Sequence, residues 1–82
     1  MSFYVYVLQS NKNGFIKTYV GWTKDLNKRL EKHNLGKGAK STRGRNWKII
    51  YYEILSSKRK AMRREYAIKK NRRFRQTLKM NL

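Results

Sequence analysis

Three apolar segments, separated by strongly basic sequence, constrain the fold of this chain most. The first, FYVYVLQ over residues 3–9, is β-branched or aromatic at both alternating sets of positions. This pattern predicts a strand covered on both faces and therefore central in its sheet. Asn13-Gly14 indicates a hairpin turn to a second strand over residues 16–22. The third segment, WKIIYYEIL over residues 47–55, predicts a third strand.

Helices are expected after the second and third strands. Thr23 can cap one that ends near residue 34, with Asp25 in its first turn. A second helix is expected over residues 58–70, and the basic residues 71–82 form a last short helix or fray. The order β-β-α-β-α-α predicts an α+β domain with a three-stranded, mainly antiparallel sheet flanked by helices.

The charge balance points to the kind of partner. Lys and Arg number 22 against four Asp and Glu, a net charge of +18 that a polyanion would relieve. We expect nucleic acid, with DNA favoured over RNA; a solvated basic surface, an anionic membrane surface and an RNA-bound structural role are the alternatives. The chain has no cysteine, no secretory signal pattern and no apolar run near the roughly 20 residues of a membrane span. These features predict a cytoplasmic protein without a membrane partner.

Residues 36–45, GKGAKSTRGR, carry glycines, cations and hydroxyls without any periodic pattern. Such a segment is either a mobile connector or a loop whose amides and side chains contact phosphates. The second reading is favoured by the charge. The predicted nucleic-acid-binding residues are Lys37, Lys40, Arg43, Arg45, Lys69 and Lys70.

Glu65 is the most informative of the few carboxylates. On a helix over residues 58–70, one stripe consists of Ala61, Met62, Glu65 and Ile68. A carboxylate in a core-facing stripe is costly unless it is paired or bound to a cation. The two interpretations are an ion pair with Lys69 or Arg64, and a metal site.

A second cluster lies near the first helix. Asp25, Arg29 and His33 are spaced at i, i+4 and i+8, so they share one helical column. Tyr6 and Tyr19 lie on the adjacent predicted strands that lead into it. A surface ion pair and a structural histidine are the plain interpretations, and a catalytic cluster is the other.

Taken in order, these residues resemble the GIY-YIG nuclease superfamily, and within it the small standalone UPF0213-like members. Tyr4-Val5-Tyr6 stands where the GIY element belongs, and Tyr19-Val20-Gly21 is the YIG element. The family's arginine, histidine and metal-binding glutamate match Arg29, His33 and Glu65. The resemblance covers about residues 3–70. It implies a nuclease domain over residues 1–70, with 71–82 as a basic helix or tail of the same domain.

Two departures stand beside this resemblance. Tyr4 replaces the glycine of the GIY element, as is common in the small members. The asparagine found downstream in several nucleases of the family has only Asn71 as a weak candidate.

The resemblance implies a metal-dependent DNA endonuclease that uses Mg²⁺ or Mn²⁺, with Glu65 as the metal ligand. Arg29 would stabilise the transition state. Tyr6 or Tyr19, with His33, would orient or deprotonate the attacking water. Tyrosine has a reference pKa of about 10, so either nearby cations lower the pKa or His33 takes the proton.

We expect structure-selective or weakly selective cutting in repair or recombination, because the sequence carries no separate DNA-recognition domain. The alternative is a catalytically weak or inactive basic module that binds DNA or RNA. The nuclease interpretation requires that the hydroxyls of Tyr6 and Tyr19 open into the same cleft as Arg29 and Glu65. A glutamate on the opposite side of the sheet would contradict it.

Overall fold

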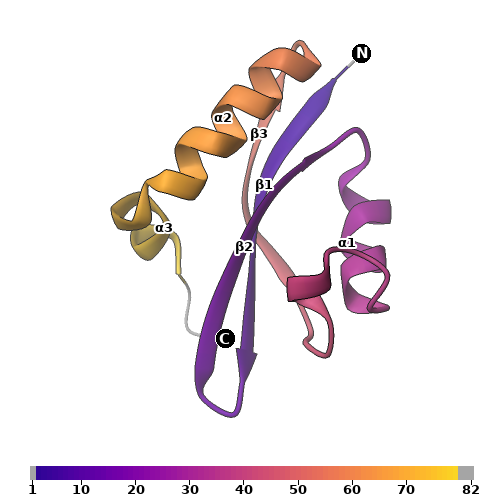
Figure 1. The fold of residues 1–82 in the computed structure, drawn as a ribbon, viewed down its shortest axis with the longest axis vertical. Helices are drawn as coiled ribbons and strands as arrows, with labels where there is room; N and C mark the ends of the chain where they lie inside the picture. The colour runs from indigo at the N-terminus through magenta and orange to yellow at the C-terminus, as the bar shows by residue number, and fades with distance from the viewer. Residues whose placement is uncertain (1, 80–82) are drawn as a thin grey trace.

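The computed structural model describes residues 2–79 and contains a three-stranded sheet with helices on both faces (Figure 1). The strand order is β2-β1-β3, and β1 pairs antiparallel with both neighbours. The elements are β1 (Phe3–Lys12), β2 (Phe15–Thr23), α1 (Leu26–Asn34), the 3-10 turn η1 (Lys40–Thr42), β3 (Lys48–Leu55), α2 (Lys58–Lys70) and α3 (Arg72–Leu78). The predicted α+β class, element order and central first strand are confirmed.

The β1–β2 hairpin is longer than the sequence predicts. Asn13 and Gly14 have φ angles of 54° and 83°, in the left-handed region that two-residue hairpin turns require. Because this turn is so tight, pairing continues down to Lys12 and Phe15. The polar residues expected to form a loop therefore extend both strands.

The central strand is buried on both faces, as its sequence predicts. On one face Val5 and Val7 pack with α2 residues Ala61 and Ile68, and Phe74 and Leu78 of α3 join this cluster. On the other face the buried residues are Tyr6, Leu8 and Trp47, packed with Leu26 and Leu30 of α1. α1 therefore covers one face of the sheet, and α2 and α3 cover the other (Figure 1).

The start of α1 differs from the prediction. Asp25 is the N-cap, and its side chain accepts a hydrogen bond from the Lys28 amide at 3.1 Å. Thr23 lies at the end of β2, and its hydroxyl contacts the Asp25 backbone instead. Asp25 wins because its backbone is extended (φ −141°, ψ 103°), as an N-cap requires.

The second and third helices follow the prediction. α2 spans residues 58–70 with Ser57 as its N-cap. α3 is the short terminal helix, capped by the Asn71 side chain, which accepts from the Phe74 amide at 3.0 Å. Residues 80–82 of the predicted tail lie outside the described residues. Within residues 2–79, no helix has both the length and the apolar character needed to cross a bilayer.

Candidate active site

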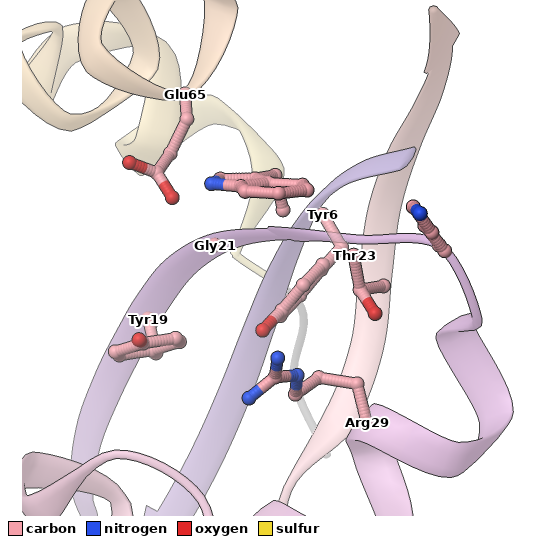
Figure 2. A pocket seen from close by; sticks show the side chains of 8 residues that line it. Tyr6, Tyr19, Gly21, Thr23, Arg29 and Glu65 are labelled. Carbon is pink, nitrogen blue, oxygen red and sulfur yellow. The ribbon is translucent and has the colours of Figure 1, made fainter. Parts of the chain in front are cut away.

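A pocket of about 450 Å³ opens at the β2 edge of the sheet (Figure 2). The predicted site residues Tyr6, Tyr19, Arg29 and Glu65 all line it. The remaining lining residues are Gly21, Trp22, Thr23 and Lys24. Phenol, guanidinium and carboxylate groups thus face one space.

Gly21 explains how residues from opposite faces of the sheet meet. α1 and α2 cover different faces, so the Glu65 backbone lies on the side of the sheet away from Tyr6, the placement expected above to contradict the nuclease interpretation. Its side chain nevertheless lines the same pocket as Tyr6, at the edge of the sheet. Tyr6 pairs with Gly21 across the strands, and a Cβ atom on Gly21 would lie 2.4 Å from the Tyr6 hydroxyl oxygen. Without a side chain there, the Tyr6 ring passes under the edge strand, and Glu65 reaches down to the same edge (Figure 2).

Behind the pocket, Tyr6 is linked to a buried polar chain. Its hydroxyl lies 2.9 Å from Nε2 of His33, and Nδ1 of His33 lies 2.9 Å from the Thr42 hydroxyl. His33 is 1% exposed, so it supports Tyr6 from inside and does not line the pocket. The Tyr19 ring is also close, with its centroid 4.9 Å from that of His33.

Burial decides the protonation of this chain. Burial raises the pKa of the Tyr6 phenol, with smaller contributions from Tyr19 and Glu65 that outweigh the opposing effect of Arg29. Burial and the nearby Arg29 cation lower the pKa of His33. Near pH 7 Tyr6 is therefore a phenol and His33 a neutral imidazole. The nearby cations therefore do not lower the pKa of Tyr6 below its reference value.

Arg29 is a cation with no ion-pair partner among residues 2–79. The predicted column does not pair Asp25 with Arg29, because the Asp25 carboxylate accepts from the Lys28 amide instead. The Arg29 guanidinium faces the pocket beside Tyr6 (Figure 2). An anion in the pocket would meet an unpaired positive charge.

Glu65 lies at the boundary of the α2 core stripe. Ala61 and Ile68 are buried, but Met62 is 49% exposed, so the stripe is narrower than predicted. The Glu65 side chain is 20% exposed and contacts Lys69 at 3.4 Å, which is one of the two predicted ion pairs. The other is absent, because Arg64 binds Glu53.

The donor set fits a divalent ion held by a single carboxylate. Within residues 2–79, no group of three or more His, Asp or Glu side chains is placed to hold a metal. Mg²⁺ is often bound through one or two carboxylates, with waters and substrate phosphates completing the shell. Glu65 supplies one such carboxylate, in a pocket that opens to solvent. Asn71 caps α3 and does not line the pocket.

The predicted nucleic-acid-binding residues fall into two groups on opposite sides of the sheet. Lys37, Lys40 and Arg43 are exposed on the loop after α1, and Lys69 and Lys70 are exposed at the end of α2. Arg45 differs, since its guanidinium donates to the Ser10 hydroxyl and to the carbonyl oxygens of Ser10 and Phe15. It therefore ties the loop to the β1–β2 hairpin.

Sequence reasoning missed three residues around the site. Lys24 and Trp22 line the pocket, and their only signal is that they stand beside the YIG-like element. Thr42 is fully buried against His33 although it comes from a basic, glycine-rich segment. Nothing in the sequence distinguishes it from the neighbouring Ser41.

Comparison with known proteins identifies the family of this chain. The model of the GIY-YIG catalytic domain matches residues 2–79. A UPF0213 protein of Clostridium perfringens is 48% identical over 68 residues, 82% of this chain and 70% of the relative. One from Staphylococcus haemolyticus is 45% identical over 67 residues, 80% of this chain and 78% of the relative.

A solved structure is similar as well. The solution NMR structure of a UPF0213 protein from Bacillus halodurans is 42% identical, with a TM-score of 0.53. The match covers 95% of this chain and 82% of that one. The family model and these relatives extend over most of the chain, so the protein belongs to the GIY-YIG catalytic domain family, among its UPF0213 members.

Proposed function

We propose that the protein is a metal-dependent DNA endonuclease of GIY-YIG type, structure-selective or weakly selective, that acts in repair or recombination. One observation carries the proposal: a single pocket brings together an unpaired guanidinium, a carboxylate and a phenol backed by histidine. Phosphodiester hydrolysis needs a positive charge beside the phosphate, a side chain that binds a metal cation, and a group that accepts a proton from the attacking water.

The charged residues have distinct roles in this proposal. Glu65 would hold Mg²⁺ or Mn²⁺, which when bound supplies Lewis-acid polarisation of the phosphate and stabilises the leaving oxygen. The Arg29 guanidinium binds a non-bridging phosphate oxygen and neutralises the charge that develops on it. Lys24, at the pocket rim, contributes further positive charge toward the substrate backbone.

The proton follows the polar chain. A water molecule attacks phosphorus, a new P–O bond forms, the bond to the leaving oxygen breaks, and the leaving oxygen takes a proton from solvent. The water proton passes to the Tyr6 hydroxyl oxygen as the Tyr6 proton passes to Nε2 of His33, 2.9 Å away. This route suits a phenol whose pKa is raised, since Tyr6 need not become a free phenolate.

The second candidate is a binding module that cuts weakly or not at all. The ion pair between Glu65 and Lys69 favours it, as does the lack of an asparagine among the described residues that line the pocket. It would use the same exposed cations on DNA or RNA.

A cleavage assay separates the two. Branched, nicked and single-stranded DNA, and matched RNA, are incubated with the protein and Mg²⁺ or Mn²⁺. Metal-dependent cutting that differs between DNA structures supports the endonuclease, and binding without cutting on any substrate supports the module. Both predict electrostatic binding: with roughly five to eight phosphates contacted, log K falls against log salt with a slope of about −4 to −7 on duplex.

A further inference from the structure

The loop over residues 36–45 has a second role beyond its exposed cations. Thr42, within the η1 turn, is fully buried between exposed neighbours. Its hydroxyl lies 2.9 Å from Nδ1 of His33, and its carbonyl oxygen accepts from the Trp47 indole N–H at 2.8 Å. The loop is thus packed against the histidine that backs the candidate active site.

The direction of these hydrogen bonds follows from the proton count. The Thr42 hydroxyl has one proton, and it donates that proton to the Ala39 carbonyl oxygen at 2.7 Å. Toward His33 the hydroxyl oxygen must therefore accept, so Nδ1 carries the proton. In a neutral imidazole the other nitrogen is then an acceptor, and Nε2 accepts from the Tyr6 hydroxyl.

The rest of the loop holds Thr42 at this position. A Cβ atom on Gly38 would lie 2.5 Å from Nδ1 of His33, so the loop backbone packs directly on the ring. The Arg45 guanidinium ties the far end of the loop to the hairpin. Two further contacts therefore limit movement of the hydroxyl relative to the imidazole.

We propose that Thr42 is a positioning residue: its hydroxyl fixes His33 as the Nδ1–H tautomer, which leaves Nε2 free to accept the Tyr6 proton. This inference rests on the proposed function, because it explains how the relay from Tyr6 is kept in one direction. With the opposite tautomer, the Nε2–H group would point at Tyr6. Tyr6 would then have to accept from His33 and could not pass its proton on.

The first test needs no activity. The chain has one histidine, so ¹⁵N-histidine labelling gives the nitrogen signals of a single ring. The spectrum is recorded at about pH 7.5, roughly one unit above the reference pKa of histidine. The proposal requires a protonated Nδ1 and an unprotonated Nε2. A wild-type spectrum of the Nε2–H tautomer would overturn it.

The second test uses Thr42→Val, which keeps the shape but removes the hydroxyl. We expect the Nδ1–H tautomer to lose its dominance and metal-dependent cleavage to fall by at least about 10-fold. Thr42→Ser restores the hydroxyl and should restore both. Thr77→Val is the matched control, because the Thr77 hydroxyl also donates to the carbonyl three residues before it, at 2.6 Å, at an exposed position of α3.

The outcomes are separable from failure of the proposed function. A Thr42→Val protein with the wild-type tautomer and cleavage rate would refute the positioning role. A serine variant no better than the valine variant would also refute it. If wild type cuts no substrate, the tautomer signals still decide whether Thr42 sets the ring. If the valine variant does not fold, the wild-type spectrum decides it.

Discussion

Two glutamates, Glu53 on β3 and Glu65 on α2, are buried to nearly the same extent but have very different surroundings. The side chains of Glu53 and Glu65 are 22% and 20% exposed. Glu53 accepts from Nε and Nη2 of Arg64 at 2.8–3.0 Å and from the Tyr51 hydroxyl. Among residues 2–79, the only ion-pair partner of Glu65 is Lys69, at 3.4 Å.

The difference separates a structural carboxylate from one that can bind a ligand. A carboxylate offers about four lone-pair sites. Arg64 and Tyr51 occupy most of those of Glu53, and their hydrogen bonds, the one from Arg64 first, lower the pKa of Glu53. Glu65 lines the pocket and has only the ion pair with Lys69 among residues 2–79, so it keeps lone-pair sites for a ligand. Exposure alone does not reveal this, because the two values are almost equal.

The largest effect is expected when the charge of Glu65 is removed. Glu65→Gln should lower metal-dependent cleavage by about 10³-fold or more, because several kcal/mol of transition-state stabilisation is lost. DNA affinity should stay equal or rise slightly, because the substitution removes a negative charge from a cationic surface. Glu53→Gln, of similar burial, should keep cleavage near wild type. Single-turnover rates and affinities are measured on both.

The contrary results are clear for this pair. Metal-dependent cutting by Glu65→Gln at the wild-type rate would show that Glu65 is only the partner of Lys69. Equal loss in both variants would mean that cleavage depends on general stability. Melting temperatures measured in parallel identify that case.

The next effect compares the arginines that belong to these two regions. Arg29→Ala should reduce cleavage by about 10²- to 10³-fold, because the guanidinium stabilises charge in the transition state. Binding should lose at most one phosphate contact. Arg64→Ala removes the partner of Glu53 and should lower stability more than rate. If the two variants lose cleavage equally, Arg29 has no special place in the chemistry.

A smaller effect concerns metal binding without substrate. Mn²⁺ prefers oxygen ligands as Mg²⁺ does and broadens the NMR signals of nearby nuclei. We expect broadening of the amide signals around Glu65 and little around Glu53, whose oxygens already accept from Arg64 and Tyr51. Glu65→Gln should remove the broadening. Broadening centred on Glu53 would reverse the assignment.

The smallest effect is on stability against pH. The pKa of Glu53 is lowered from 4.5 in the folded state, so its contribution is present above about pH 4.5 and is lost as pH falls through the folded pKa. For a partly exposed pair it is about 1 kcal/mol. Urea unfolding of Glu53→Gln should show this loss near pH 7 and converge with wild type at acid pH. A constant difference across this range would contradict it.

Much of the fold follows from local patterns. The Asn13-Gly14 turn, the doubly apolar first strand and the Ser57 cap each specify an element through interactions between near neighbours. The prediction of Thr23 as the cap of α1 was wrong, because β2 continues to pair up to Thr23 and the helix begins only after Asp25.

The candidate site divides along a similar line. The resemblance to the GIY-YIG family pointed to Tyr6, Tyr19, Arg29 and Glu65, and the structure brings them to one pocket. The sequence did not predict which of these side chains lie next to one another. Placing Glu65 with Tyr6 depends on Gly21 at a sheet edge, and the partner of His33 comes from a loop with no periodic pattern.

By itself, the sequence determined the strands and helices of this protein, its basic surface and the side chains available for chemistry. Only the tertiary structure decided which glutamate accepts hydrogen bonds from several donors, which tyrosine is buried and which nitrogen of His33 accepts a proton. The physical reason is that protonation and ligand capacity depend on burial and on hydrogen-bond partners distant in the chain. Those partners exist only once the sheet edge, α2 and the 36–45 loop have packed together.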